Sequence, residues 1–222
     1  MNNLTLIIPA KFESESLPIV LQELKDFNYK INVILHKSDT KTIEAIQKFN
    51  LNIIYQKNHG YGDALIEGIK KCKTDLFCIF NADGSFNPSE IKFMLLSLES
   101  QKLDFVFASR YQKNSGSEDD TIVTLIGNFI FTKIGNIFFK LPITDILYTF
   151  VIGKTSKANE LNLVKKDFSF CVELPIKAAK KQMLIGSFSS YERKRIAGKK
   201  KVNAFKDGLI ILIHMLKLLF FK

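Results

Sequence analysis

The sequence is poor in cysteine, with only Cys72, Cys78 and Cys171. Their number is odd and their spacing matches no paired metal motif, which argues against a disulfide-stapled scaffold and a cysteine-rich zinc site. The chain also lacks a charged-then-apolar leader with a small-residue cleavage site, and it has no internal repeat or low-complexity tract. We therefore expect a protein of the reducing cytosol.

Acidic residues are scarce in one half of the chain only. Residues 1–110 hold 13 lysines and arginines against 13 aspartates and glutamates, whereas residues 111–222 hold 19 against 9, which is the whole net charge of +10. A basic half is typical of a solvated surface, or of a protein that contacts phosphate, anionic lipid or nucleic acid. With 222 residues, 46% of them hydrophobic, the chain suits one domain, with or without an appendage.

The first half alternates apolar runs with helical patterns at short spacing. Continuous apolar strands separated by helices are typical of a parallel sheet with helices on both faces. We therefore expect a doubly wound α/β domain. The predicted strands are 4–8, 31–35, 51–55, 76–80 and 105–108, and the predicted helices are 15–27, 40–49, 62–73 and 88–101.

Three of these strands lead into loops with chemically active side chains, namely IPAKFE, FNADGS and ASRY. In such sheets ligands bind at the carboxyl ends of strands, so we expect the three loops to converge on one site. Asp83, with Asn81 and Ser85 as further oxygen donors, could hold Mg²⁺ or Mn²⁺ against a pyrophosphate, because these ions prefer oxygen ligands. An Asx turn without a metal explains the same residues.

Glycines precede the third predicted helix, in HGYGDALIEG (59–68). Gly60 and Gly62 permit tight turns beside a ligand, or a phosphate cradle. Ala64 and Gly68 lie four residues apart on one helix face, where small side chains allow a close approach to the neighbouring element.

Two apolar segments mark the second half, near 122–141 and at 207–222. A helix over residues 208–221 would be about 21 Å long, which is short of the about 30 Å of a bilayer core. We expect this helix to lie in the membrane interface with Lys206, Lys217 and Lys222 at the headgroups. A core helix or a homodimer helix is the alternative.

The order of these motifs resembles the family 2 glycosyltransferases of GT-A fold, especially the branch that transfers sugars to polyprenyl (dolichyl) phosphate. The motifs that carry the resemblance are IPAKFE (8–13), GYGDALIEG (60–68), FNADGSFNP (80–88), ASRY (108–111), ITD (143–145), Glu173 and ERKRIAGKKKV (192–202). The ordered set spans nearly the whole chain and is more specific than any of its members.

The resemblance implies an inverting, Mg²⁺- or Mn²⁺-dependent transfer of a sugar from a nucleoside diphosphate donor. The acceptor it implies is a polyprenyl phosphate or another envelope-glycan acceptor. It implies an acceptor-phosphate contact at Arg110, and contacts to donor or acceptor phosphate at Arg195 and Lys201. The residues it assigns to the nucleotide sugar are Pro9, Glu13, Asp39, Gly60, Gly62, Asn81, Ala82 and Asp83. The alternatives to these phosphate contacts are a structural ion pair for Arg110 and a solvated surface for residues 193–201.

From this resemblance we expect a glycosyltransferase domain over residues 1–202, with a nucleotide half (about 1–110) and an acceptor half (about 111–202). Residues 203–222 would form the membrane-interface helix. We expect the enzyme to be cytoplasmic and peripheral at the inner face of the plasma membrane, because a basic surface is attracted to anionic lipid.

The chain departs from the family at several positions. The family usually has aspartate at Asn81, serine at Lys200, and an Asp-Asp-Gly-Ser turn where this chain has LHKSD (35–39). Loss of one carboxylate should weaken metal binding. Loss of the acidic turn leaves the base of the donor open, with Asp39 as a partial substitute.

The acceptor decides whether a catalytic base is needed. A lipid phosphate is already an anion at neutral pH, whereas a hydroxyl acceptor must lose its proton to a carboxylate. Asp145 is the first candidate for that base and Glu173 the second, and both could instead be structural.

Three other functions are alternatives. A sugar nucleotidyltransferase normally has a glycine-rich loop after its first strand, and IPAKFESES contains no glycine. A catalytically silent binding or scaffold protein is favoured by Asn81 and LHKSD. A nucleic-acid-binding protein would use the basic half, but the sequence contains no recognised module and no aromatic residues within the lysine run, so we expect no nucleic-acid partner.

Overall fold

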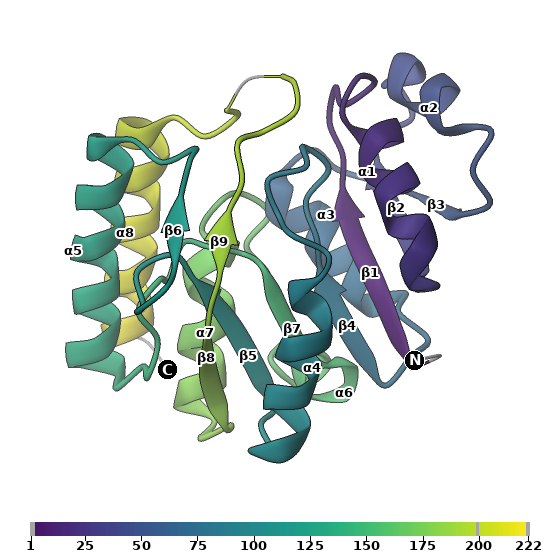
Figure 1. The fold of residues 1–222 in the computed structure, drawn as a ribbon. Helices are drawn as coiled ribbons and strands as arrows, with labels where there is room; N and C mark the ends of the chain where they lie inside the picture. The colour runs from purple at the N-terminus through teal and green to yellow at the C-terminus, as the bar shows by residue number, and fades with distance from the viewer. Residues whose placement is uncertain (1–2, 199, 221–222) are drawn as a thin grey trace.

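A seven-stranded sheet of order β3-β2-β1-β4-β7-β5-β8 forms the centre of the computed structural model, which describes residues 3–198 and 200–220 (Figure 1). Its strands are β1 Leu4–Pro9, β2 Lys30–Leu35, β3 Asn52–Tyr55, β4 Leu76–Ile79, β5 Phe105–Ser109, β7 Val151–Lys154 and β8 Ile185–Ser189. All neighbours pair in parallel except β7, which is antiparallel to β4 and β5. The mostly parallel doubly wound sheet expected from the sequence is confirmed.

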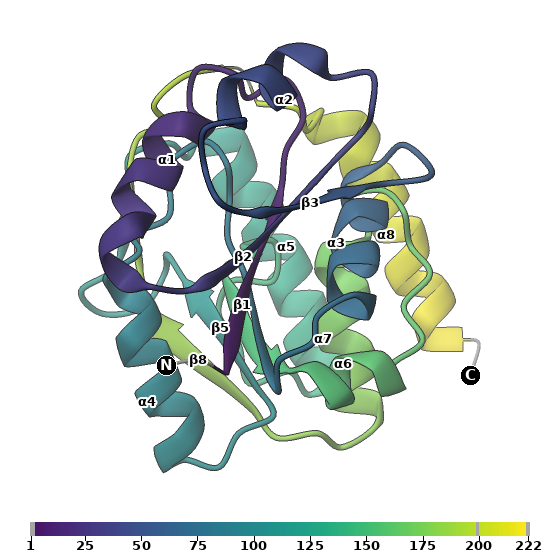
Figure 2. The same cartoon turned by 90° about the vertical axis from the view of Figure 1, so that its right-hand side faces the viewer.

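Helices cover both faces of this sheet (Figure 2). One face packs on α1 (Leu17–Leu24) and α4 (Glu90–Ser100), and the other on α3 (Tyr61–Lys70), α6 (Thr155–Glu160) and α7 (Phe170–Lys180). Consecutive residues of β1 therefore lie in different cores: Leu6 faces the first and Ile7 the second, and neither is exposed. This two-sided burial explains why the strands are continuous apolar runs.

The predicted helices of the first half form with shifted starts. α1 begins at Leu17 after Ser16, with a proline in its first turn, and continues into a 3-10 helix at Lys25–Phe27. α2 (Thr40–Ile46) follows Asp39, whose side chain accepts a hydrogen bond from the Thr42 backbone. The structure adds β7, β8, α6 and α7, and also a small parallel pair of β6 (Gly116–Ser117) with β9 (Tyr191–Glu192), none of which was predicted.

Two long helices, α5 (Ile122–Phe139) and α8 (Ala204–Phe220), lie side by side at one end of the molecule and also contact α7 (Figure 1). α8 starts a few residues before the predicted helix and buries Ile211, His214 and Met215. The α8 helix is therefore part of the packed structure on one side, while its other side is exposed.

Candidate donor and acceptor site

The turn after β4 brings the three predicted metal ligands together. The Ser85 backbone donates to Asp83 Oδ1 at 3.1 Å, the Phe86 backbone donates to Asn81 Oδ1 at 3.3 Å, and the Asn81 amide donates to Ser85 Oγ. The first of these is the bond of an Asx turn, and the other two hold Asn81 and Ser85 in the same loop. Asp83 Oδ2 takes no part in these bonds and pairs instead with a cation from another segment.

That segment is residues 193–198, here called the basic segment, which runs across the turn. The Ile196 backbone donates to Asp83 O and the Arg193 backbone donates to Ser85 O, both at 2.8 Å. Ile196 covers Gly84, where an added Cβ would lie 2.3 Å from Ile196 Cδ1. Gly84 also has φ +83°, so a side chain there would be strained for two reasons.

Arg195 links three segments at the carboxyl end of β4. Its Nη1 lies 3.3 Å from Asp83 Oδ2, and its Nη2 lies 2.8 Å from Asp119 Oδ2. Hydrogen bonding to Asp119 raises the pKa of Arg195 above its usual value. Burial acts to raise the pKa of Asp119, but Arg195 and Lys200 hold that pKa below its usual value. At neutral pH the site therefore contains a charged Arg195–Asp119 pair.

Glu13 follows β1 and also meets a cation. Its carboxylate pairs with Lys201 and accepts a hydrogen bond from Ser16 Oγ at 2.7 Å. A pocket of about 110 Å³ separates Phe12–Ser16 from Ala197 and Gly198. The loop after β1 and the end of the basic segment thus lie close together.

Asp39 orients the loop after β1. Its Oδ2 accepts a hydrogen bond from the Phe12 backbone at 2.6 Å, and the Glu13 backbone donates to Thr42 Oγ1 at 3.0 Å. Pro9 is the last residue of β1 and pairs with Ile34 of β2, while Ala82 is buried in the turn after β4. These predicted nucleotide residues surround the carboxyl ends of β1, β2 and β4.

Gly60 and Gly62 are explained by a close approach of backbone. A Cβ on Gly60 would lie 2.1 Å from Lys166 O, and a Cβ on Gly62 would lie 2.1 Å from Lys165 O. The Asp63 backbone donates to the same Lys166 carbonyl at 3.1 Å. The start of α3 is therefore packed directly on the loop that precedes α7.

Glu173 holds this same loop from the other side. The carboxylate is not exposed, accepts hydrogen bonds from the backbones of Val164 and Lys165, and pairs with Lys177 at 2.8 Å. The carboxylate of Glu173 is thus occupied by structural contacts.

Arg110 lies in a buried ion-pair network after β5. Its guanidinium contacts Asp145 with two bonds of 2.7 and 3.1 Å and Glu192 with one of 3.1 Å, and it lies 4.6 Å from the ring centroid of Tyr148. Burial acts to lower the pKa of Arg110, but the two carboxylates raise it well above its usual value. Asp145 is fully buried and has both oxygens bonded to Arg110.

Sequence reasoning placed Asp119 in an acidic loop (118–120) that either covers the site or is merely solvated, and Glu192 and Ile196 in the motif 192–202, but it did not identify their partners. Each acts on a residue at least 70 positions away, and the nearby sequence gives no signal of that contact. Within residues 3–198 and 200–220, no three histidine, cysteine, aspartate or glutamate residues cluster as for a metal. A cation at Asp83 would therefore need oxygen ligands from Asn81, Ser85, solvent or a bound diphosphate.

Relatives match this chain over different shares of its length. Glycosyltransferases described as uncharacterized, from Mycobacterium bovis and Mycobacterium tuberculosis, are 23% identical over 209 residues, or 94% of both chains. The dolichol-phosphate mannosyltransferase of Pyrococcus furiosus is 28% identical over 124 residues, which cover 52% of this chain and 35% of that protein.

A solved structure has the same fold at low identity. Glucosyl-3-phosphoglycerate synthase from Mycobacterium tuberculosis, in complex with Mn²⁺, UDP-glucose and phosphoglyceric acid, superposes with a TM-score of 0.76 and 11% identity over 98% of this chain and 79% of that one. The family model "Glycosyl transferase family 2" matches residues 5–161, well over half of the sequence. The chain therefore belongs to glycosyltransferase family 2 and has its GT-A fold.

Proposed function

We propose that this glycosyltransferase moves a sugar from a nucleoside diphosphate onto a phosphate-bearing lipid at a membrane surface. The observation that carries the proposal is the apolar outer side of α5, a helix whose partly buried Phe131, Ile134 and Phe139 pack inward on the core. Its buried residues are Asn128, Thr132 and Gly135, and its outer side is apolar. The exposed large apolar residues of α5 are Ile122, Val123, Leu125, Ile126, Phe129, Ile130, Ile137 and Phe138.

Two polar residues of α5 are used inside the protein. Asn128 Oδ1 accepts a hydrogen bond from the Leu147 backbone at 3.1 Å, and Thr132 Oγ1 accepts one from the Ile146 backbone at 3.2 Å. A surface helix in water has its apolar side inward and its polar side outward. The outer side of α5 therefore fits an apolar medium better than water.

α8 extends this surface. Its exposed apolar residues are Phe205, Leu209, Ile210, Ile213, Leu216 and Phe220. We call the exposed apolar residues of α5 and α8 the apolar plate. Exposed lysines on or next to these helices, including Lys133, Lys140, Lys206 and Lys217, suit an anionic headgroup layer.

The apolar plate begins beside the donor cleft. Thr121 caps the start of α5 and lies two residues after Asp119, which binds Arg195 next to Asp83. Among the described residues, α5 is the one helix long and apolar enough to cross a membrane. Since it packs on α7 and α8, we place it in the interface, where a lipid phosphate would reach the basic segment.

Transfer requires neutralisation of the departing diphosphate. Asp83, with Asn81 and Ser85, has the oxygen donors to hold Mg²⁺ or Mn²⁺, which when bound would supply positive charge at that diphosphate. Arg195 provides a permanent positive charge at the same place. The named relatives act on or bind dolichol phosphate and phosphoglyceric acid, so both have a phosphate-bearing partner.

A phosphate acceptor also agrees with the contacts of Asp145 and Glu173, the two predicted bases. Asp145 is bonded to Arg110 through both oxygens, and Glu173 is enclosed by backbone groups and Lys177. An anionic acceptor needs neither group as a base. We therefore assign Asp145 to holding Arg110 and Glu173 to holding the loop before α7.

Donor binding requires the basic segment, and Lys201 after it, to move. Pockets for nucleotide-sized ligands usually have volumes of about 300 Å³ or more, and the pocket beside Glu13 has about 110 Å³. Displacement of Lys201 from Glu13 and of Arg195 from Asp83 would open the cleft and free both cations for phosphate.

The donor half of the proposal is tested by thermal melting with UDP- and GDP-sugars in the presence and absence of Mn²⁺. We expect metal-dependent protection by one donor in the wild type and its loss in Asp83→Ala. Protection that persists unchanged in Asp83→Ala would contradict the assigned metal site.

The membrane half is tested by flotation with vesicles of phosphatidylcholine alone or with 30% phosphatidylglycerol. The wild type should float, more so with the anionic lipid, and Ile126→Glu with Phe129→Glu should stay in solution while keeping donor protection. Phe93→Glu on α4 is the matched control, because Phe93 is exposed outside the plate. A wild type that does not float would overturn the membrane placement. A dimer in solution that the double variant dissociates would make the plate an interface between copies.

A further inference from the structure

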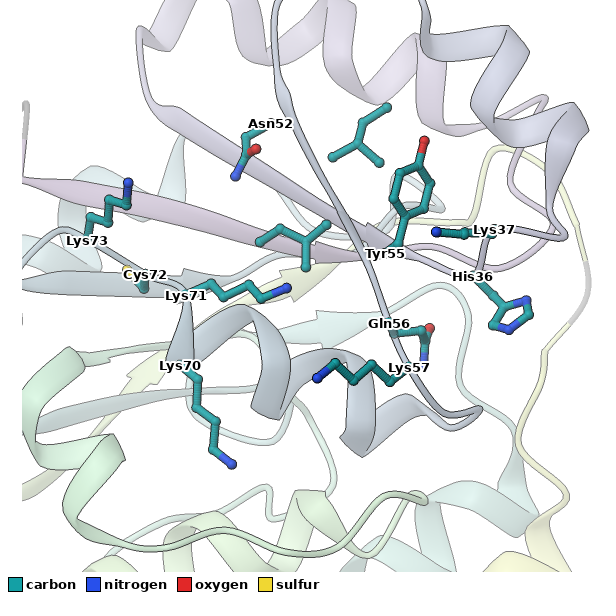
Figure 3. A pocket seen from close by; sticks show the side chains of 12 residues that line it. His36, Lys37, Asn52, Tyr55, Gln56, Lys57, Lys70, Lys71, Cys72 and Lys73 are labelled. Atoms are coloured by element: carbon teal, nitrogen blue, oxygen red, sulfur yellow. The ribbon is translucent and has the colours of Figure 1, made fainter.

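A second surface feature lies at the opposite end of the sheet from the apolar plate. It is an open groove of about 890 Å³ along β3, between the carboxyl end of β2 and the last residues of α3 (Figure 3). The site residues described above do not line it. We call it the edge groove.

The edge groove is strongly basic. It is lined by Lys37, Lys57, Lys70, Lys71 and Lys73, which are five of the 13 basic residues in the otherwise neutral first 110 residues. Lys71 lies 3.5 Å from Glu67, and Lys37 lies 5.5 Å from the ring centroid of Tyr55. In the part of the chain that the structure describes, Lys57, Lys70 and Lys73 have no carboxylate within ion-pair distance. The groove therefore has positive charge that the chain itself does not neutralise.

The backbone of β3 is available on the groove side, because β3 is the edge strand and pairs with β2 alone. The Gln56 backbone donates to Leu35 O of β2 at 3.0 Å. Backbone direction alternates along a strand, so the backbone groups of Ile53 and Tyr55 point away from β2. An unpaired row of this kind is a template for another strand.

The lysines do not protect this edge in the usual way. Proteins commonly block an edge strand with lysine or proline on the strand itself, and β3 (Asn-Ile-Ile-Tyr) has neither. The lysines instead come from the segments that flank it. Figure 3 shows Lys57 and Lys71 extending toward one another, whereas Lys70 points away from β3.

We propose that the edge groove binds an extended acidic segment of a partner protein, which adds to β3 as a further strand. The added backbone would pair with Ile53 and Tyr55, and its carboxylates would meet Lys57, Lys71 and Lys73. The four residues of β3 span about 13 Å, which suits a segment of about four to six residues.

The position of the groove separates this ligand from lipid. If the apolar plate lies on a membrane, the edge groove faces the aqueous phase at the other end of the sheet. A single-stranded nucleic acid would be expected to stack its bases on aromatic rings. The groove offers two rings, and both already have a partner: Lys37 lies over Tyr55, and the His36 ring lies 4.1 Å from that of His59. The charge and the free strand edge together favour an acidic peptide.

The test uses the full chain and a fluorescein-labelled peptide, Glu-Val-Glu-Val-Glu-Val, followed by fluorescence anisotropy. The wild type should bind it, and 0.5 M salt should weaken binding. Lys57→Gln with Lys71→Gln should reduce the affinity about fivefold or more. Lys57→Arg with Lys71→Arg keeps both charges and should retain the affinity. Lys92→Gln with Lys102→Gln, exposed lysines outside the groove, should bind as the wild type does.

Strand addition is tested separately from charge. A peptide with proline in place of each valine keeps its carboxylates but cannot pair as a strand, and it should bind at least about tenfold more weakly. Ile53→Pro removes an outward-facing N–H and should have the same effect on the original peptide, with melting curves to check the fold. Equal binding of both peptides, no binding by the wild type, or tighter lysine-dependent binding of a ten-nucleotide oligouridylate would each overturn the proposal.

Discussion

At the residue scale, the site depends on single side chains that join distant segments. Arg195 contacts Asp83 after β4 and Asp119 before α5, and Lys201 contacts Glu13 after β1. The motif residues were predictable because Asn81, Asp83 and Ser85 are contiguous with an apolar strand. The pairing of Asp119 was not, because its partner is an arginine 76 positions later.

Asp119 gives the prediction at this scale. Asp119→Asn removes the charge that orients Arg195, so we expect about a tenfold weaker affinity for the sugar donor with a smaller change in the rate at saturation. Titration calorimetry with Mn²⁺ and the protecting donor measures the affinity.

Glu118→Gln is the control for Asp119→Asn. Glu118 contacts Tyr191 and the Lys194 backbone rather than Arg195. Equal donor affinities for the wild type and Asp119→Asn would show that Arg195 is positioned without Asp119.

At the element scale, α5 and α8 show what hydrophobicity alone leaves undecided. The sequence identified both as apolar segments, but apolar residues surround much of each helix and do not indicate which side is buried. The structure buries Asn128 and Thr132 of α5 because the backbones of Leu147 and Ile146 require acceptors there. The core alternative describes the buried side of α8, and the membrane-interface alternative stays a prediction for its exposed side.

His214 on α8 makes the stability of the fold depend on pH. The ring is buried and neither nitrogen has a hydrogen-bond partner. Burial lowers the pKa of His214 to about 4, helped by Lys165 and opposed by Glu173. The folded chain thus binds fewer protons than the unfolded chain between about pH 4 and 6.5, so stability falls as the pH decreases through that range.

We expect His214 to account for up to about 2 kcal/mol of lost unfolding free energy between pH 7 and pH 5. Urea unfolding at both pH values measures this loss. His214→Leu should remove this part of the pH dependence, whereas His59→Gln, at an exposed position, should retain it. An unchanged pH dependence in His214→Leu would show that His214 is not the responsible group.

At the scale of the whole molecule, residues 203–222 are predicted from the sequence to form a helix separate from the glycosyltransferase domain. The sequence suggested a boundary at residue 202, and this stays a prediction. In the structure α8 packs on α5 and α7, and Ile211 and Met215 are buried.

A chain that ends at residue 202 is the test of that boundary. Its loss of apolar burial should lower the melting temperature by at least about 5 °C and increase binding of an apolar dye. A double variant of exposed positions, Leu209→Gln with Leu216→Gln, controls for loss of surface apolarity and should melt near the wild type. A truncated chain that melts like the wild type would support the predicted boundary.

The sequence by itself determined the parallel α/β core, the oxygen-rich turn after β4 and the family, because each depends on contiguous residues or on the order of the motifs along the chain. It did not predict β7 and β8, and it could not show that Arg110, Asp145 and Glu192 form one buried network. Only the tertiary structure decided which charges meet and which side of α5 is exposed. Such contacts join residues far apart in the chain, and their geometry is set by the packing of the whole sheet rather than by any local pattern.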